Sequence, residues 1–583
     1  MYFHSSTYSS LSTNIIEKVF RAYRHEVAAL ESVSASERTH RLKSILQTHG
    51  LKTSTQSYNY TNPTSGDLLS SGDNVYAILQ GPRADATEAM VLIASWRNME
   101  DKINYSGVAL VLTLARYFAR WSLWSKDIIF LLTSDATAGS QAWVDAYHDA
   151  HDPAQVEPLS LKSGALQGAV ALDYPAGPWG HRFDKLHIVY DGINGQLPNL
   201  DLFNTAVAIA SGQMGISCTL QRMWHHKDSY TDRLSTMLRG MLNQGLGHAT
   251  GPHSAFIPYH VDAITLQTVG DGWHDEMSLG RSVEGLFRSL NNLLEHLHQS
   301  FFFYLLMHAQ RFVSIGTYLP SAMLVAGSFT IMSIALWVRS GRPTDAPSNP
   351  ASTAPSSSTE KQTGKSKEKE EEVTILQSGD SLAIIPIAQL QTTERALFLP
   401  LTLLVGIHFL ALLPLYTFTD LPTSLLTPAF HIFTALTLPL PYLVSKSLPR
   451  TLGRPVNSQE TILLQCFTLM NLGLFLSALA TLNFSLSLII GTLSTPLSFI
   501  RPSNNRIINI LQVALLTALA PPVVITVAAG WSGIPGVSLE VVLGMAMSGW
   551  WVHGLWTGLV VWLVWWPAWF LGCLVVGCGI FSS

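Results

Sequence analysis

The pattern of apolar positions divides the chain into two parts of different character. Up to about residue 311, short apolar runs alternate with helix-length amphipathic stretches and an ordinary number of charged residues. Beyond that point, long apolar stretches follow one another along the chain. The hydrocarbon core of a bilayer, about 30 Å thick, requires roughly 20 apolar residues in a helix that spans it. The pattern therefore predicts a water-soluble domain followed by membrane-spanning helices.

Seven apolar stretches are predicted to span the membrane, and the fifth is the shortest. They are Phe312–Val338, Ala396–Thr419, Ser424–Ser445, Thr461–Leu482, Phe484–Ile500, Ile507–Ala529 and His553–Ile580. Basic residues favour the cytoplasmic side of a membrane. The clusters at 446–454 and 501–506 share that side only if an even number of crossings separates them, so we expect a turn near Asn483. The connections then assigned to the opposite side, Asp420–Thr423, Asn483 and Gly530–Trp551, contain no Lys or Arg.

The same rule places the segment 339–394 in the cytoplasm and the soluble domain on the far side, in the lumen. We expect the Ser/Pro-rich and Lys/Glu-rich parts of this loop to be disordered, because they cannot bury apolar surface. The predicted organisation is a lumenal domain over residues 1–300, a juxtamembrane helix and first spanning helix over 301–338, a disordered loop over 339–394 and six further spanning helices over 395–583.

The first 30 residues are polar and contain no apolar region of a secretory signal. Two explanations are open for a lumenal domain without one. Either the helix Phe312–Val338 carries the preceding residues across the membrane, or a spanning helix precedes this sequence; we favour the second. Cys218 is the single cysteine of the soluble part, so we expect a free buried thiol, with an intersubunit disulfide as the alternative.

Strands and helices alternate in the soluble part, which predicts an α/β domain with a mainly parallel sheet covered on both faces. The predicted strands are Val75–Leu79, Met90–Ala94, Asp127–Leu132, Ala169–Leu172, Leu186–Tyr190 and Ala263–Thr268. The predicted helices are Gly107–Trp121, Gly139–Ala150, Leu202–Met214, Asp232–Asn243 and Arg281–His298.

Functional residues of such sheets gather at the carboxyl ends of the strands. The polar residues found there, with Asn104–Ala109 opening one helix and Gly139-Ser140 opening another, resemble the arrangement of the di-zinc aminopeptidases. In that family the corresponding acidic and histidine side chains hold two zinc ions, which activate the attacking water. The resemblance implies an aminopeptidase-like fold for the domain.

Most of the metal ligands of that family are replaced in this chain. Ile103 stands at the bridging aspartate, Ser95 and Arg97 at the His-x-Asp pair, and Thr133 and Ser134 at the Glu-Glu pair, with Asp135 one place beyond; the vestigial candidates that remain are Asp173 and His274. Two isolated ligands cannot hold a zinc pair. We therefore predict no metal, no other cofactor and no peptidase activity.

Other chemistries find little support in the sequence. The histidines at 225, 226, 248, 253 and 260 are interpreted as surface residues rather than a metal site. No G-x-S-x-G, P-loop or paired C-x-x-C motif occurs, and a net charge of −4 without a basic patch argues against nucleic-acid binding. A transporter function is a weak hypothesis, because the apolar stretches contain almost no ionisable residues beyond His408, His431 and His553.

Three strings carry a more specific resemblance: Asp191–Asn204 (DGINGQLPNLDLFN), Leu290–Leu306 (LNNLLEHLHQSFFFYLL) and Arg311–Gly316 (RFVSIG). With the peptidase-like frame and the helix count, they resemble the attachment subunit family of the glycosylphosphatidylinositol (GPI) transamidase. The resemblance runs from about Val75 to the last helix. It implies a membrane protein of the endoplasmic reticulum with one helix ahead of the lumenal domain and seven after it.

The resemblance implies a non-catalytic subunit of the complex that joins preassembled GPI anchors to the new carboxyl end of precursor proteins. Its partners would be the other subunits, including a caspase-like cysteine protease, together with the GPI lipid and the precursors. The family's anchor-binding proline in the last helix corresponds to Pro567. The alternative is a degenerate enzyme in which Asp173, Asp135 and His274 assist formation of the amide bond.

Two further expectations concern the membrane and the lumen. Seven tryptophans between Trp550 and Trp569 suggest either a lipid-lined pocket around Pro567 or an ordinary aromatic belt. The apolar face near Leu290–Phe303 predicts an interfacial helix. Asn59 is the expected glycosylation site; Asn104 and Asn483 also match the acceptor motif, but one opens a core helix and the other lies at the membrane.

Overall fold

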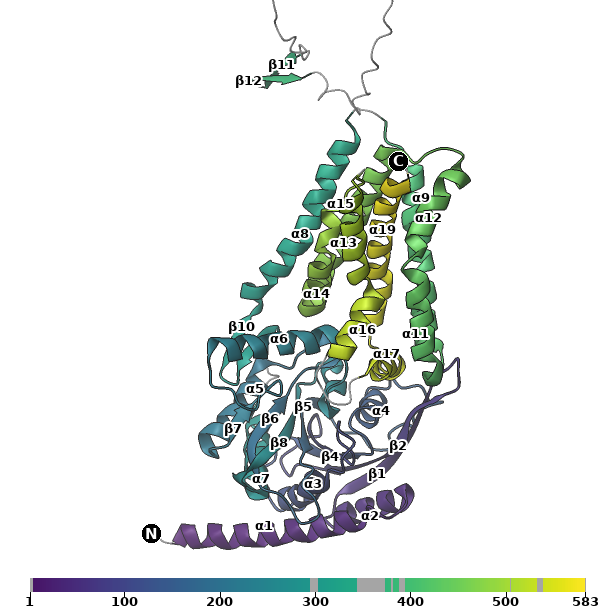
Figure 1. Cartoon of the computed structure of the whole chain (residues 1–583). Coiled ribbons are helices and arrows are strands. Elements are labelled where there is room, and N and C mark those ends of the chain that lie inside the picture. The colour runs from purple at the N-terminus through teal and green to yellow at the C-terminus, as the bar shows by residue number, and fades with distance from the viewer. Residues whose placement is uncertain are drawn as a thin grey trace, which may run out of the picture.

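The computed structural model describes residues 4–293, 302–342, 373–378, 381–386, 394–503, 505–531 and 538–581. Figure 1 shows a broad α/β domain at one end and a bundle of helices at the other. The two N-terminal helices, α1 (His4–Ala29) and α2 (Ala35–Gln47), lie across the side of the domain that faces away from the bundle. The predicted order, an α/β domain followed by an all-helical region, is confirmed.

Eight strands of the described chain form the central sheet, in the order β1-β2-β4-β3-β5-β8-β6-β7. The pairs β3–β4, β3–β5, β5–β8 and β6–β7 are parallel, and β1–β2, β2–β4 and β6–β8 are antiparallel. The mainly parallel sheet predicted from the sequence is thus found at the centre, flanked by antiparallel pairs. The strands are β1 (Lys52–Thr61), β2 (Leu68–Leu79), β3 (Glu88–Ser95), β4 (Asp127–Thr133), β5 (Ala165–Asp173), β6 (Phe183–Val189), β7 (Ser217–Thr219) and β8 (Ala263–His274).

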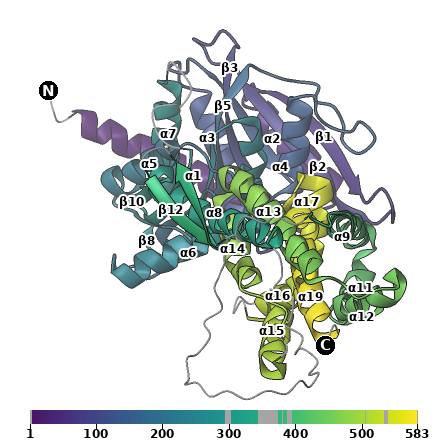
Figure 2. The same cartoon turned by 90° about the horizontal axis from the view of Figure 1, so that it is seen from above.

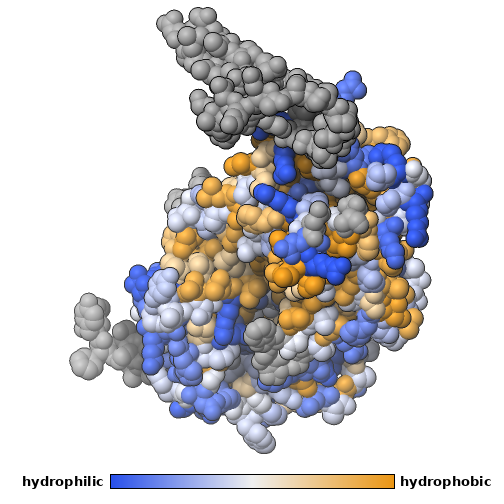
Figure 3. Space-filling view, turned by 45° about the horizontal axis from the view of Figure 1, so that its top comes forward, coloured by the Kyte–Doolittle hydropathy of each residue, from blue (hydrophilic) through white to orange (hydrophobic). Residues whose placement is uncertain are grey.

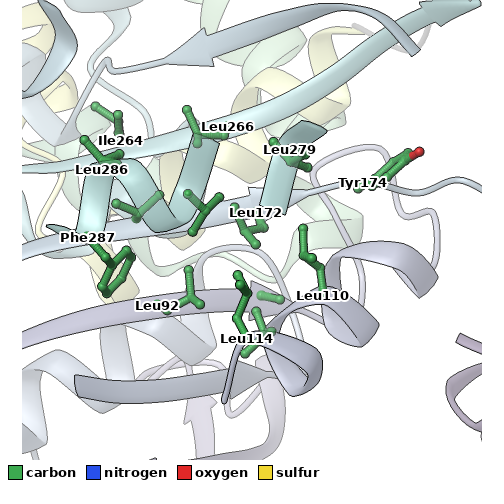
Figure 4. Close-up of a cluster of buried hydrophobic side chains, with 14 of the residues drawn as sticks. Leu92, Leu110, Leu114, Leu172, Tyr174, Ile264, Leu266, Leu279, Leu286 and Phe287 are labelled. Carbon is green, nitrogen blue, oxygen red and sulfur yellow. The ribbon is translucent and has the colours of Figure 1, made fainter. Parts of the chain in front are cut away.

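Helices cover both faces of this sheet, which is why its central strands are continuous apolar runs. One face packs against α3 (Tyr105–Phe118), α5 (Leu200–Val207) and α7 (Glu276–Asn291), and the other against α4 (Ala138–Tyr147) and the short turns at 252–259. In Figure 4, Leu92, Leu172 and Leu266 project from three neighbouring strands toward leucines of α3 and α7. Burial of these side chains fixes the sheet in place.

The second part contains helices at every position where the sequence predicted a span. They are α8 (Ile315–Ser340), α9 (Phe398–Leu410), α10 (Leu412–Asp420), α11 (Thr423–Thr437), α12 (Leu440–Leu452), α13 (Ser458–Leu482), α14 (Phe484–Ser494), α15 (Arg506–Ala518), α16 (Pro521–Trp531), α17 (Leu539–His553), α18 (Thr557–Val560) and α19 (Trp566–Phe581). Judged by length and composition, the described residues include four spans, or six if each of two bent pairs is one span. The predicted fifth span corresponds to an apolar helical segment, Phe484–Ser498, that is shorter than these.

The C-terminal helix lies at the centre of the bundle. In its most apolar window 83% of the residues are buried inside the protein, compared with 28% for α8 at the periphery. Figure 3 shows many apolar side chains on the surface of the helical part, while hydrophilic ones gather over the α/β domain. This distribution is the one required of a bundle that contacts lipid.

Several elements differ from the sequence-based prediction. The connection predicted at Gly530–Trp551 contains α17, which was missed because Gly and Ser interrupt its apolar residues. Strands β11 (Val373–Ser378) and β12 (Ser381–Pro386) pair within the loop expected to be disordered, whose Ser/Pro-rich part lies outside the described residues.

The helix predicted to continue through Leu290–Phe303 ends earlier. Helix α7 ends at Asn291, and the chain resumes after the undescribed residues 294–301 as a hairpin of β9 (Tyr304–His308) and β10 (Arg311–Ser314). This hairpin leads directly into α8.

Candidate functional site

The carboxyl ends of β3, β4 and β5 meet at one edge of the sheet, as predicted. Ser95 at the end of β3 pairs in register with Thr133 at the end of β4, and Asp173 ends β5 opposite Gln267 of β8. Asn104 caps the start of α3 at the same edge: its Oδ1 accepts from Gly107 N (3.1 Å) and Tyr174 N (2.8 Å). The peptidase-like frame that the sequence suggested therefore brings these positions together.

Asp173 is one of the two vestigial ligand candidates, and its carboxylate is held inside the protein. Only 8% of the residue is exposed. Asn98 Nδ2 donates to one oxygen at 3.1 Å and Gln267 Nε2 to the other at 3.0 Å. Burial raises the pKa of Asp173 to about 6, although both hydrogen bonds favour the charged form. Two neutral amides thus occupy both oxygens.

Both oxygens of the Asp135 carboxylate also accept hydrogen bonds from surrounding residues. Its Oδ2 accepts from Tyr58 Oη (2.9 Å) and Ser70 Oγ (2.7 Å). Its Oδ1 accepts from the backbone N–H groups of Thr137 (3.0 Å) and Gly139 (2.8 Å), which lie at the beginning of α4. The carboxylate therefore stabilises a helix N-terminus rather than facing an open cleft.

His274 does not join the other two residues. Phe183 and Lys185, two residues apart on β6, pair with His274 and Val269, which are five residues apart on β8. The extra residues bulge outward, and the His274 ring is buried against Phe183 and Trp273, with centroid distances of 5.7 and 4.0 Å. No hydrogen bond or ion pair links His274 to Asp173 or Asp135 in the described part of the chain.

The remaining positions of the frame contain no group that could replace the metal ligands. Arg97 pairs with Asp101 at the surface, and Ile103 forms a backbone bridge with Arg97. Among the described residues, no group of three or more His, Cys, Asp and Glu side chains could hold a metal ion. This includes the histidines noted in the sequence, of which His253 is buried and bonds to Thr265 Oγ1 at 2.7 Å.

A small cavity of about 110 Å³ lies beside this edge, beneath α2. The guanidinium of Arg38 stacks over the Trp96 ring at 4.5 Å, and the wall carries hydroxyls of Ser71, Thr133 and Ser134. The lining thus offers hydroxyl groups and the charged side chains of Arg38 and Asp73 for hydrogen bonds to polar groups, and it contains no cysteine or histidine.

A second cluster, which we call the joint, connects the domain to the bundle through Asn194. The Asn194 backbone has a φ of 58°, which asparagine tolerates better than most residues. Its Nδ2 donates to the Gly554 carbonyl (3.1 Å), and its Oδ1 accepts from Trp556 N (3.0 Å). One side chain thus fixes the turn between α17 and α18.

Asn483 extends the joint to the start of α14. Its Nδ2 donates to the backbone carbonyls of Asn194 (3.0 Å) and Gln244 (2.7 Å), while its Oδ1 accepts from Leu486 N at 2.9 Å. A Cβ at Gly195 would lie only 2.5 Å from Asn483 Nδ2, so that position requires glycine. The recognised string beginning DGING is therefore one part of the domain that contacts the bundle.

Pro567 is buried in the first turn of α19, directly after a π-helical segment, η7 (Val561–Trp565). The helix runs continuously from Thr557 to Phe581, so Pro567 lies in its interior, where proline removes one intrahelical hydrogen bond. Trp566 Nε1 donates to Thr437 Oγ1 (3.0 Å) and Trp569 Nε1 to the Leu516 carbonyl (2.7 Å). Together with Trp562 and Trp565 they are core residues of the bundle rather than members of an exposed aromatic belt.

The joint was not identified from the sequence, although its string was singled out. The Asn-Gly pair at 194–195 signals a turn, but nothing local indicates that its amide bonds to residues some 290 and 360 positions later.

Comparisons with known proteins assign the chain to a family. The model of the Gaa1-like GPI transamidase components matches residues 71–573. The GPI transamidase component gaa1 of Schizosaccharomyces pombe is 32% identical over 480 residues, 81% of this chain and 71% of that protein. The component GAA1 of Saccharomyces cerevisiae is 37% identical over 321 residues, which are 54% of this chain, so this chain spans about half (49%) of that relative.

Solved structures similar to the α/β domain include a putative Zn-dependent exopeptidase from Bacteroides vulgatus, with 14% identity and a TM-score of 0.29 over 47% of this chain and 96% of that one. A zinc aminopeptidase from Bacillus subtilis has 8% identity and a TM-score of 0.32, over 48% of this chain and 98% of that one. These scores are too low to support a functional conclusion.

Replacing Asp173 by Asn should change how stability depends on pH. Because burial holds the folded pKa of Asp173 at about 6, above the ordinary aspartate value of about 3.9, the wild type loses stability as pH rises through this interval. Two pKa units correspond to roughly 3 kcal/mol. Melting temperatures measured from pH 4 to 7 should therefore rise for Asp173→Asn relative to wild type as pH increases. Asp101→Asn, at an exposed site, is the control, and parallel curves for Asp173→Asn and wild type would contradict the assignment.

Replacing Asn194 should loosen the joint. Asn194→Gly keeps the backbone conformation but removes both side-chain hydrogen bonds, and should cost about 1–3 kcal/mol. Asn194→Ala should cost about 1 kcal/mol more, because alanine is strained at positive φ. The measurements are the melting temperature of the detergent-solubilised chain and protease cleavage between Gly554 and Trp556. Equal stability of wild type and Asn194→Gly would show that the side-chain bonds contribute nothing.

Proposed function

The chain belongs to the Gaa1-like family of GPI transamidase components, and from this we propose that it is a non-catalytic subunit of a GPI transamidase complex. Its role would be to bind or present the GPI lipid while a partner subunit forms the bond to the precursor protein. The proposal includes a caspase-like cysteine protease as the catalytic partner, and precursor proteins with C-terminal signals as substrates.

The observation that carries the non-catalytic part is the state of the peptidase-like edge. Both oxygens of Asp173 accept from amide side chains, whereas Asp135 accepts from the start of α4 through Oδ1 and from Tyr58 and Ser70 through Oδ2. A carboxylate that acts as general base must reach the proton it abstracts. These two would first have to break the bonds that hold them.

The lipid-presenting part is supported by the terminal helix. Pro567 begins α19 beside a π-helical segment, and such segments occur frequently at functional sites. The π segment lies five residues after the turn that Asn194 holds, so the domain and this helix are connected over a short distance in the chain. Movement of the domain would change the position of Pro567 directly.

For location, we propose an endoplasmic reticulum membrane protein with a lumenal α/β domain and seven crossings after it. The distribution of Lys and Arg supports this orientation, and the helical segments described above agree with seven crossings if Phe484–Ser498 also spans.

The alternative function, a degenerate enzyme using Asp173, Asp135 and His274, is weakened by the separation of His274 from the two carboxylates. If it were correct, the double variant Asp173→Ala, His274→Ala would lose anchor attachment while the complex still assembled. Attachment at the wild-type rate in an assembled complex would exclude this function.

Pro567→Ala tests lipid presentation. We expect weaker anchor binding, by about an order of magnitude (~1.4 kcal/mol), because an alanine N–H would restore a regular helix and change the backbone where the lipid is held. The measurement is cross-linking of a photoreactive GPI lipid to the chain in the purified complex, with anchor transfer to a precursor as a second readout. Pro428→Ala, at an exposed proline within α11, is the matched control. Unchanged cross-linking at Pro567→Ala would contradict the proposal.

Glycosylation tests the lumenal orientation. Asn59 is exposed on β1, whereas Asn104 and Asn483 are buried and hydrogen-bonded. Asn59→Gln should therefore abolish the shift in gel mobility that endoglycosidase treatment causes. Asn104→Gln and Asn483→Gln should leave the glycan in place on any folded chain. A wild-type chain without glycan would remove this support for a lumenal domain.

A further inference from the structure

Helix α6 (Tyr230–Leu246) carries a row of large apolar side chains that the other described elements leave partly or largely exposed. The row consists of every fourth residue, so its members lie on one face of the helix. They are Tyr230, Leu234, Leu238, Leu242 and Leu246, and they are 78, 38, 47, 55 and 54% exposed. We call this row the leucine stripe. A continuous apolar stripe of this length on a soluble domain marks an interaction surface.

The stripe faces away from the domain, because the opposite side of α6 packs onto it. A Cβ at Gly240 would lie 3.5 Å from Tyr190 Oη, and Asn243 Nδ2 donates to Gln221 Oε1 at 2.7 Å. The side between these two faces packs toward α8 and α14 through Met237 and Met241. In the described structure, the side chains of the stripe remain 38 to 78% exposed.

The position of α6 decides what the stripe meets. The C-terminal end of the helix is tied to the bundle: Thr557 Oγ1 donates to the Leu246 carbonyl at 3.0 Å, and Ser485 Oγ to Gln244 Oε1 at 3.1 Å. Figure 1 shows α6 lying across the foot of the bundle, on the side of the domain from which the helices rise. In Figure 2, seen from the bundle side, most of α6 extends beyond the helices and nothing covers it.

We propose that α6 is an interfacial helix whose leucine stripe lies in the lipid boundary of the membrane. A helix of this kind buries its apolar face about 5–10 Å into the region between head groups and acyl chains. The surface continues into lipid-facing residues of the bundle, since Leu482, 67% exposed, directly precedes Asn483, which bonds to α6. This continuity favours lipid as the occupant over another protein.

Neighbouring residues suit the same boundary. Phe302, Phe303 and Phe312 are 44, 50 and 41% exposed around the β9–β10 hairpin, and this hairpin packs beside α6. An interfacial contact was expected from the sequence near Leu290–Phe303. The proposal assigns the main contact to α6 instead, a helix that the sequence pattern placed among those of the soluble domain. The proposal requires a membrane-embedded bundle but does not depend on the transamidase function.

The experiment places a fluorophore at single positions of the full chain. Leu238→Cys and Leu242→Cys variants are labelled with a thiol-reactive nitrobenzoxadiazole and reconstituted into phosphatidylcholine vesicles, with doxyl-labelled phosphatidylcholine as the lipid quencher and iodide as the aqueous quencher. Leu324→Cys, exposed on α8, is the lipid-facing control, and Gln47→Cys, exposed at the end of α2, is the water-facing control. The wild-type chain, with Cys218 half-buried and its other cysteines buried, gives the labelling background.

We expect Leu238→Cys and Leu242→Cys to be quenched by doxyl lipid as at Leu324→Cys, and several-fold less by iodide than Gln47→Cys. Quenching by iodide at the level of Gln47→Cys would show that the stripe faces water and would overturn the proposal. Protection from both quenchers would also overturn it, because protein would then cover the stripe. Leu234→Cys repeats the measurement if either substitution prevents folding.

Discussion

The arrangement of the whole molecule depends on the hydrogen bonds of Asn194. Its side chain holds the turn at Gly554–Trp556, and its carbonyl accepts from Asn483 at the start of α14. Each bond contributes about 1 kcal/mol, which is small beside the apolar burial within either part. Their importance is geometric. Together with the packing of α6 on α14 and the bonds of Asn62 and Asp67 to the α10–α11 connection, they fix where the domain lies on the bundle, and with it the level at which α6 meets the membrane.

At the peptidase-like edge of the sheet the backbone arrangement is present, but the described residues include no group of side chains that could hold a metal ion. Asn104, with its three hydrogen bonds to neighbouring backbone groups, still joins α3 to β5, so the strands end where catalytic groups would be placed. Burial raises the pKa of the Asp173 carboxyl. Hydrogen bonds from two amides partly replace the water that the carboxylate has lost. Asp173 thereby connects the end of β5 to Gln267 of β8 and to Asn98.

The sequence was sufficient for the fold class, the central strands and the helical segments, because each of these depends on local periodicity. Runs such as Met90–Ala94 are apolar since both faces of the sheet are covered, and that pattern is visible without a structure. It was insufficient for β1 and α2, whose polar positions conceal a one-sided burial, and for α17, in which Gly544 and Gly549 interrupt the pattern. The place of His274 in the structure could not be predicted, because it follows a bulge in β8 and the pattern of apolar residues does not reveal bulges.

The candidate sites, too, were predictable where they depend on local pattern or topology and not where they depend on distant contacts. The positions of Asp173 and Asp135 at strand ends were predicted from topology, but their hydrogen-bond partners come from distant segments. The leucine stripe is visible in the sequence as apolar residues at every fourth position. The same pattern is equally typical of a helix packed into a core. Only the position of α6 at the foot of the bundle distinguishes the two.

The joint also has a consequence for the order in which the molecule is assembled. Asn194 bonds to Asn483 and to Gly554, which are separated from it by 289 and 360 residues. Contacts of such large sequence separation close last, since the chain between them must already be in place. During synthesis the completed α/β domain therefore waits, with the polar groups of Asn194 hydrated, until the final helices have been inserted. A chain truncated before α17 would lose the bonds of Asn194 to Gly554 and Trp556 but keep those of Asn483 to Asn194 and Gln244.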